Sequence, residues 1–486
     1  MTQSVRQSPN AGQGARPPLD ETVGPAPLEV DLLISGATLI TMNARREVIE
    51  DGALAVRGGV LVAVDKRQVL ERRVRPKATV DGRRFVATPG FIDGHIHITG
   101  DPLTRGFLRG GPDDSWSEKL QRWVIPIFRA QSAADEALSA QCAALAMIRG
   151  GATTFVEAGT VLQLDPVMEA LAGTGIRGRV GQWVEGRAFK ASEDQARMSA
   201  AAIAILESEV QRYPDAGDAL LAAWPILVGH STNSDEVWRA ASDLAKAHGV
   251  RVSAHMSPRA GDPEWFLATY GRRPLEHLAD IGVLGPHLML THLADIDASE
   301  LEHLVSSGAG VIHCPHAALQ GGFGVSAKGL FPEMLDRGVN LMLGTDGVAA
   351  DILGSGRLMA SLFRDARADQ DLIPTTSVLE MMMTKPARAL GMDDRIGALE
   401  VGRRADIVLH DTNLPEWGPV FDAVGQLAFS APSHGVHSVW IDGVQVLEGG
   451  RSTRIDEEKV LADARQAGRE VIARTGLPNR TPWPVL

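Results

Sequence analysis

Eight short apolar segments alternate with amphipathic helical stretches through the middle of the chain. The segments are residues 89–98, 153–157, 180–184, 220–228, 251–254, 288–291, 310–312 and 340–343. Strands that alternate with helices build parallel sheets covered by helices. Eight such units predict an α/β protein with a (β/α)8 TIM barrel over residues 86–395. A doubly wound sheet is the competing architecture, but no Gly-x-Gly-x-x-Gly turn follows the first strand.

The segments before and after this region have a different sequence pattern. Short strands broken by glycines occupy residues 29–85 and return at 396–450, which predicts one small β-sandwich domain built from both ends of the chain. Residues 1–28 are rich in Gly, Pro, Gln and Ser and predict a flexible tail. The charged stretch 454–475 predicts a C-terminal helix.

Composition excludes several classes of protein. The formal net charge of −12 argues against a nucleic-acid binder, whose surface is basic. Two distant cysteines exclude a disulfide framework and a thiolate zinc site, and they fit a reducing cytoplasm. No apolar run is long enough to span a bilayer, and the N-terminus lacks the order of a signal peptide. We therefore expect a cytoplasmic protein without nucleic-acid or membrane partners.

Polar residues gather at the ends of the predicted strands. His95 and His97 are two residues apart in a strand, so both imidazoles project from one face. In a barrel, the carboxyl ends of the strands share one mouth, and the later strands end near Glu157, His255, His292, His313, His316 and Asp346. Three imidazoles and one carboxylate suit a zinc-like ion with a position left for water. Such an ion lowers the pKa of its water to about 7.

Structural alternatives exist for each of these residues. A histidine at a strand end is often a hydrogen-bonded structural residue, and for His313 and His316 that role is as well supported as one around a metal. Glu157 either orients a ligand or is a satisfied structural carboxylate. Cys314 precedes a proline, and we expect it to be buried and inert. The remaining histidines, His230 among them, are expected on the surface or in the core.

Taken together, the motifs resemble the amidohydrolase superfamily. They are Pro89-Gly-Phe-Ile-Asp-Gly-His-Ile-His97, Ser253-Ala-His-Met256, Thr291-His292, His313-Cys-Pro315 and Leu343-Gly-Thr-Asp-Gly347, supported by residues 384–391 and 396–408. The similarity covers residues 30–450 and is to the branch with cytosine, guanine and S-adenosylhomocysteine deaminases and triazine hydrolases. It implies that His95, His97, His255 and Asp346 bind the metal and that His292 steadies the hydrolytic water or a substrate oxygen. No lysine ends the fourth strand, so the two-metal branch with a carbamylated lysine is not expected.

The departures from the family pattern concern the substrate. Deaminases of this branch carry a glutamate three residues after the histidine of the fifth strand, where this chain has Pro258. The Ser-Asn usual after His-Cys-Pro is replaced from His316 onward, and a serine usual after Gly-Thr-Asp-Gly is replaced near Ala350. Trp116 and its aromatic neighbours follow the first strand; they either line the mouth or pack a helical insertion.

These observations favour a metal-dependent hydrolase of a C–N bond in a small neutral molecule. An amide, urea, carbamate or thiocarbamate is the expected substrate, such as a phenylurea or thiocarbamate herbicide, by resemblance to phenylurea and molinate hydrolases. The alternatives are a deaminase or dechlorinase of an N-heterocycle, and a non-catalytic barrel that serves in assembly.

The expected cofactor is one divalent ion per chain, zinc before iron, cobalt or manganese. Asp346 and His292 are the predicted catalytic residues. The predicted substrate contacts are Glu157, His316, Trp116 and Met256. A homo-oligomer is expected.

Overall fold

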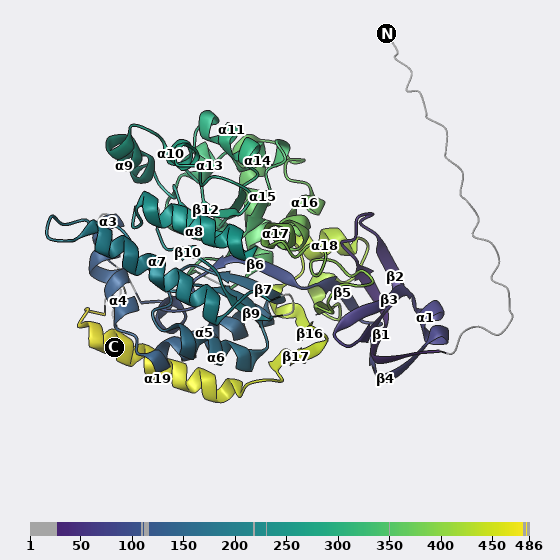
Figure 1. Cartoon of the computed structure of the whole chain (residues 1–486). Helices are drawn as coiled ribbons and strands as arrows, with labels where there is room; N and C mark the ends of the chain where they lie inside the picture. Colours follow the sequence, from purple (N-terminus) through teal and green to yellow (C-terminus); the bar gives the residue numbers. More distant parts are fainter. Residues whose placement is uncertain are drawn as a thin grey trace, which may run out of the picture.

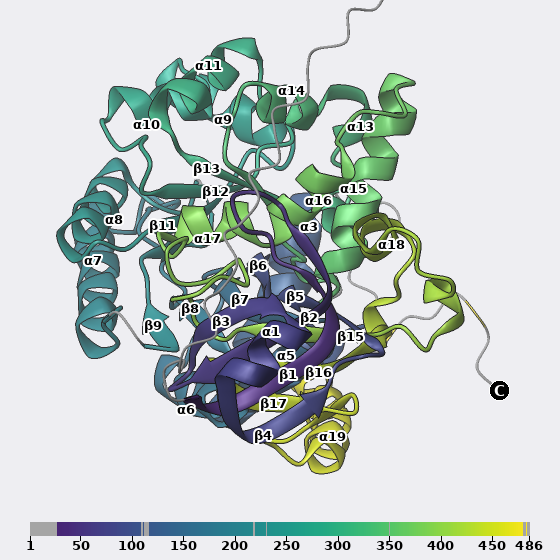
Figure 2. The same cartoon turned by 90° about the vertical axis from the view of Figure 1, so that its right-hand side faces the viewer.

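The computed structural model describes residues 27–107, 110, 116–216, 219–229, 231–348, 350–479 and 483. A β-rich part, which is purple where it comes from the N-terminal region, lies beside a larger part in which helices surround parallel strands (Figures 1 and 2). The predicted tail lies outside the described residues except for its last two positions. His230 lies outside them as well.

The β-rich part is one nine-stranded sheet that both ends of the chain build. Its strands are β1 (Leu28–Ile40), β2 (Val48–Arg57), β3 (Val60–Lys66), β4 (Val74–Asp81), β5 (Phe85–Pro89), β15 (Ile407–Asp411), β16 (Val436–Ile441), β17 (Val444–Glu448) and β18 (Arg451–Ser452). Antiparallel pairing of β5 with β15 joins the two ends. Apolar side chains from both ends, such as Leu54 and Trp440, share one buried cluster in this part of the molecule.

The larger part contains two parallel sheets. One has the order β6 (Phe91–Ile96), β7 (Ala152–Glu157), β8 (Arg177–Val180), β9 (Leu221–Ala223). The other has the order β10 (Ile226–Leu227), β11 (Val252–Met256), β12 (Leu288–His292), β13 (Gly310–His313), β14 (Leu341–Leu343). A parallel bridge between Ile96 and Asp346 connects the end of β14 to β6. The predicted α/β architecture with parallel strands is therefore observed, and the predicted fourth strand is divided into β9 and β10.

Helices cover the outer side of these strands (Figure 1). They are α2 (Asp101–Thr104), α3 (Trp116–Lys119), α4 (Ile125–Arg129), α5 (Ala133–Arg149), α6 (Leu164–Thr174), α7 (Gln195–Arg212), α8 (Asp235–His248), α9 (Gly261–Tyr270), α10 (Pro274–Asp280), α11 (Ala298–Ser307), α12 (Pro315–Gln320), α13 (Val325–Lys328), α14 (Phe331–Asp336), α15 (Ile352–Arg367), α16 (Thr375–Met382), α17 (Thr384–Leu390) and α18 (Ala423–Phe429), with a π-helical turn at Leu120–Val124. The short helix α1 (Arg67–Arg73) belongs to the β-rich part.

The helix ends follow the capping residues of the sequence. Ser132 caps α5 in a capping box with Asp135, and Asp297 caps α11 in one with Glu300. The C-terminal helix α19 (Glu457–Thr475) begins three residues later than 454, because Asp456 is its cap. It runs along α5 and α2 (Figure 1).

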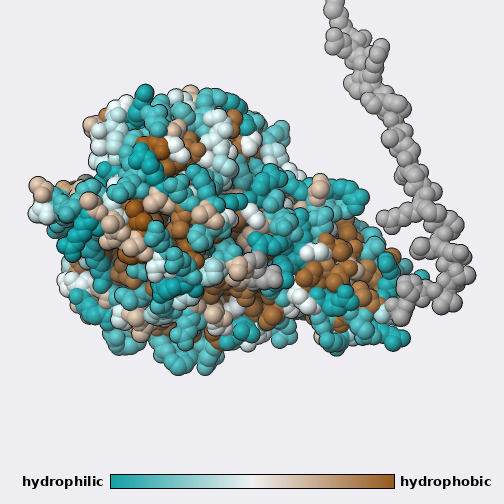
Figure 3. All heavy atoms as spheres, viewed as in Figure 1, coloured by the Kyte–Doolittle hydropathy of each residue, from teal (hydrophilic) through white to brown (hydrophobic). Residues whose placement is uncertain are grey.

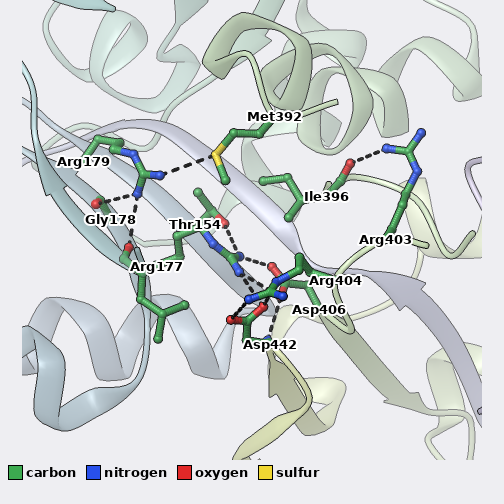
Figure 4. A network of polar contacts seen from close by, with 11 residues as sticks. Thr154, Arg177, Gly178, Arg179, Met392, Ile396, Arg403, Arg404, Asp406 and Asp442 are labelled. Atoms are coloured by element: carbon green, nitrogen blue, oxygen red, sulfur yellow. Dashed lines mark hydrogen bonds and ion pairs between the residues drawn. The ribbon is translucent and has the colours of Figure 1, made fainter. Parts of the chain in front are cut away.

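The third barrel strand was expected at residues 180–184 but lies at Arg177–Val180. The sequence analysis misplaced this strand because it contains two arginines, and charged residues rarely occupy a buried strand. Arg177 and Arg179 are 3 % and 0 % exposed. Arg177 pairs with Asp406 and Asp442, as Figure 4 shows. The guanidinium of Arg179 donates to both carboxylate oxygens of Asp215, at 2.8 and 2.9 Å.

Among the described residues, no helix has both the length and the apolar character needed to cross a lipid bilayer. On the face shown in Figure 3, hydrophilic side chains are spread over most of the larger part, and a more hydrophobic area lies over the β-rich part.

Replacing Arg177 with Met should destabilise the protein by about 3–5 kcal/mol, because Asp406 would keep a buried charge without its partner. Chemical unfolding followed by fluorescence measures the change. Arg83→Met is the matched control, since Arg83 pairs with Asp81 at an exposed site of the β-rich part, and it should leave the unfolding midpoint unchanged. Similar midpoints for both variants would show that the buried pair has no special role.

Candidate active site

Five of the predicted residues converge where the parallel strands end. His95 and His97 come from β6 and the residue after it, His255 from β11, His292 from the end of β12, and Asp346 from the turn after β14. The ring centroid of His255 lies 4.5 Å from that of His95, 5.5 Å from that of His97 and 5.4 Å from that of His292. His95 is 1 % exposed and His292 is 5 % exposed. The structure therefore brings together the whole set that the sequence assigned to the metal and to catalysis.

Asp346 lies between two of the imidazoles. Its Oδ1 is 3.2 Å from Nε2 of His97, and its Oδ2 is 3.7 Å from Nε2 of His292. Burial alone would raise the pKa of Asp346, but the hydrogen bond from His97 and the surrounding imidazoles hold it well below its usual value. Asp346 has a backbone φ of 59° and His292 one of 82°. Left-handed backbone at non-glycine residues is a feature of functional sites.

Asp93 fixes the position of this turn, a role that the sequence did not reveal. One carboxylate oxygen accepts from the backbone N–H of His95 at 3.2 Å and of Thr345 at 3.0 Å, and the other accepts from the Thr345 hydroxyl. Burial raises the pKa of Asp93 to about 7. The available signal was a carboxylate inside the apolar strand Phe91–Ile96, because a buried acid needs such donors.

The nitrogen atoms of the histidines fit a divalent metal. Nε2 of His95, Nδ1 of His255 and Nδ1 of His292 are shielded from solvent and have no hydrogen-bond partner. Burial lowers the pKa of His95 and of His255 well below the ordinary value, which favours the neutral, ligating form. Ligand atoms of His95, His97 and Asp346 lie within 4.8 Å of one another, as do those of His95, His255 and His292. A divalent ion would satisfy buried nitrogens that otherwise remain unpaired.

Cys314 is buried beside this cluster, as expected. Its sulfur could join His292 and Asp346 around an ion by distance. Burial raises the pKa of the Cys314 thiol well above its ordinary value, however, so the protonated form is favoured over the ligating thiolate.

Of the four predicted substrate contacts, the structure describes the side chains of three, and their settings differ. Glu157 is buried and accepts from Gly159 and Thr160. Met256 is 0 % exposed at the end of β11. His316 is half-buried with Nδ1 3.2 Å from the hydroxyl of Ser355, and the side chain of Trp116 lies outside the described part of the chain. Contact of these four with a substrate stays a prediction.

His313, whose role the sequence left open, stacks on Phe331 with ring centroids 3.9 Å apart. Burial lowers its pKa to about 3. The ring is thus held as a neutral group within the core beside the cluster.

Two aromatic rings lie beside different histidines of the cluster. Phe128 lies 6.2 Å from His97 between ring centroids, and Phe323 lies 5.4 Å from His292. The guanidinium of Arg259 stands 4.7 Å from the centre of the Phe323 ring. Phe323 and Arg259 come from segments without regular structure, where the sequence offers no periodicity that would place them at a site.

The segment after β11 also brings a carboxyl group toward the mouth. Ser257 has a φ of 46°, and its carbonyl accepts from the backbone N–H groups of Ala294 and Asp295, which turns the chain at Pro258. The next helix, α9, then places Asp262 in its first turn. Oδ2 of Asp262 is shielded from solvent. The charge of this carboxylate raises the pKa of both His292 and Arg259 against the larger lowering effect of burial.

Comparisons with known proteins agree with this geometry. The model of the amidohydrolase family matches residues 86–446. A 5-methylthioadenosine/S-adenosylhomocysteine deaminase of Syntrophobacter fumaroxidans is 31% identical over 450 residues, which cover 91% of this chain and 98% of that protein. One from Halobacterium salinarum is 30% identical and covers 86% of this chain and 95% of its own length.

Solved structures show the same arrangement of elements. An adenosine deaminase from Xanthomonas campestris with bound zinc has a TM-score of 0.81 and 26% identity, over 92% of this chain and 100% of that one. An atrazine chlorohydrolase from Arthrobacter aurescens, complexed with zinc, has a TM-score of 0.79 at 22% identity, over 90% of this chain and 100% of that one. The chain belongs to the amidohydrolase family and is a metal-dependent hydrolase of carbon–nitrogen bonds other than peptide bonds.

Proposed function

We propose that the protein is a hydrolytic deaminase that removes an exocyclic amino group from an N-heterocycle of the aminopurine type. The observation that carries this proposal is the 31% identity to a 5-methylthioadenosine/S-adenosylhomocysteine deaminase over 91% of the chain. We therefore favour the deaminase, which was the alternative in the sequence analysis, over the amide or urea hydrolase that the sequence favoured. The flat aromatic side chains of Phe128 beside His97 and Phe323 beside His292 suit a planar substrate ring.

The architecture that supports this site is, in our proposal, one closed (β/α)8 barrel formed by the two parallel sheets. The bridge between Ile96 and Asp346 supports closure on one side. On the other side, only Trp224 and Pro225 separate β9 from β10. The proposed domains are the barrel at 86–395, a composite β domain at 29–85 and 396–450, and the C-terminal helix; the tail at 1–28, a cytoplasmic location and a homo-oligomer stay predictions.

One divalent ion, zinc, is proposed to bind to His95, His97, His255 and Asp346. Three imidazoles and a carboxylate with a position left for water are a ligand set suited to catalytic zinc. When bound, the ion supplies a water of lowered pKa, which is nucleophilic at neutral pH.

The chain's own groups then move the protons. Asp346, with one oxygen toward His97 and the other toward His292, is placed to accept the proton of the attacking water and to deliver it to the departing amine. His292, at the end of β12, is placed to stabilise charge that develops on the attacked group. These are the roles that the sequence predicted for both residues.

Ring deamination also requires a proton on the ring nitrogen, and Pro258 offers none. We propose that Asp262 relays this proton. Its support is the position of Asp262 in the first turn of α9, where its Oδ2 is shielded from solvent and its charge raises the pKa of His292 against the effect of burial.

Amide or urea hydrolysis is the second candidate, and Pro258 is the observation that favours it. A carbonyl substrate needs no proton on a ring nitrogen, because its oxygen can be stabilised by a metal and by His292. Whether Asp262 functions as an acid therefore separates the two candidates.

The metal assignment predicts about one divalent ion per purified chain. His255→Ala should lose the ion and the activity together, because it removes one of the ligands. His248→Ala, an exposed histidine at the end of α8, is the matched control and should keep both. Elemental analysis of the two variants measures the outcome. A fully loaded and active His255→Ala protein would exclude this ligand set.

The substrate assignment predicts ammonia release from aminopurine nucleosides at a higher kcat/KM than amine release from anilides, ureas, carbamates or thiocarbamates. A coupled ammonia assay and product chromatography over both panels measure this. Turnover confined to the carbonyl panel would replace the deaminase with the second candidate.

Asp262→Asn should lower kcat for deamination by about 10²–10⁴, the usual contribution of a positioned acid or base. Glu264→Gln, an exposed carboxylate on the same helix, is the control and should leave kcat unchanged. Circular dichroism checks that both variants fold. Normal deamination by Asp262→Asn would show that the ring nitrogen receives its proton from another group.

A further inference from the structure

Three buried groups form a chain of contacts from the loop after β7 to His97. Glu157 accepts from the backbone N–H of Thr160 at 3.0 Å and from the Thr160 hydroxyl at 2.8 Å. The same hydroxyl oxygen lies 3.3 Å from Nδ1 of His97. Thr160 is 2 % exposed and Glu157 is 0 % exposed, so water does not compete for these contacts.

The direction of the hydrogen bond to His97 follows from a count of protons. A threonine hydroxyl has one proton, and the Thr160 proton points to a carboxylate oxygen of Glu157. The hydroxyl oxygen can then only accept at its side facing His97, so Nδ1 of His97 must carry the proton that it donates. Nε2, which lies 3.2 Å from Asp346 and donates to it while no ion is bound, is consequently the nitrogen that is available to a metal.

We propose that Thr160 is a positioning residue for metal binding, which fixes the orientation and the tautomer of His97 on behalf of Glu157. A carboxylate commonly fixes the ring orientation of a ligating histidine by direct contact. Here Glu157 orients the ring of His97 through the hydroxyl of Thr160. The proposal rests on the assignment of His97 as a ligand.

The loop is built for this contact. Glu157 also accepts from the backbone N–H of Gly159, so the carboxylate closes the turn that presents Thr160. Gly159 has a φ of 79°, and a Cβ there would lie 3.0 Å from Ile226 Cγ2. Glycine is therefore required at this position, both for the backbone conformation and for the close approach of β10.

His95 provides a contrast within the same site. Its Nδ1 lies 3.1 Å from the Thr291 hydroxyl. That hydroxyl has no second partner recorded among the described residues to take its proton, so the contact alone does not fix which atom donates. The contacts of His97 therefore identify its protonated nitrogen, whereas the contact of His95 does not.

The test compares Thr160→Val, Thr160→Ser and Thr99→Val. Valine keeps the shape of Thr160 but cannot accept from His97, and serine restores the hydroxyl. Thr99→Val removes a neighbouring buried hydroxyl that bonds mainly to the Thr160 carbonyl, at 3.0 Å, and is the control for loss of a hydrogen bond in the loop. All three are compared with the wild type for zinc affinity by competition with a chromophoric chelator, and for thermal stability.

Thr160→Val should weaken zinc binding about 10–100-fold, the usual effect of losing a partner of a ligating histidine. Thr160→Ser and Thr99→Val should bind zinc nearly as the wild type does. Unchanged zinc affinity in Thr160→Val would overturn the proposal. Equal weakening in Thr160→Val and Thr99→Val would also overturn it, because the hydroxyl would then have only a structural role.

A second readout uses protein without metal. Histidine labelled with ¹⁵N distinguishes a protonated Nδ1 from a protonated Nε2 by chemical shift, and His97→Asn assigns the signal. The wild type and Thr160→Ser should show a proton on Nδ1 of His97 with the chemical shift of a hydrogen-bonded group, and Thr160→Val should lose that hydrogen-bonded signal. An unprotonated Nδ1 in the wild type would contradict the contact itself, whereas failure of the protein to bind zinc would contradict only the assigned metal site.

Discussion

The close approach of β6 and the end of β14 is the constraint on which the site depends. A Cβ on Gly94 would lie 2.9 Å from the Leu343 carbonyl oxygen, and one on Gly344 would lie 2.8 Å from Cβ of His95. Two glycines therefore allow the first and last parallel strands to meet. Asp93 then ties them together through His95 and Thr345, and Asp346 is brought to His97 at the end of β6.

This arrangement gathers several groups whose burial or backbone conformation is energetically unfavourable. Imidazole nitrogens without partners, a buried carboxylate and left-handed backbone at Asp346 and His292 all cost folding free energy. The surrounding core must offset that cost, and it does so with apolar side chains of the parallel strands such as Ile312, Leu341 and Leu343, each fully buried. A site of this kind is thus prepared for a ligand before the ligand arrives, which is what electrostatic catalysis requires.

The sequence predicted the groups that stand on regular strands and missed those that depend on tertiary structure. His95, His97, His255 and Asp346 could be placed because strand ends share one edge of a parallel sheet. The strand at Arg177–Val180 was misplaced because its arginines find their acids more than 30 residues away, at Asp215 and Asp406. Phe323 comes beside His292, and Asp262 close enough to influence the pKa of His292, through turns that no periodicity encodes. The role of Thr160 follows only from its distance to His97.

The shared sheet has a consequence for the order of events during synthesis. β5 leads directly into β6, the strand that carries His95, yet its neighbour β15 lies more than 300 residues later in the chain. On the ribosome, the edge of β5 that later pairs with β15 must therefore stay unpaired until most of the chain has emerged. A strand edge that stays unpaired for so long can form non-native pairs with other strands or other chains.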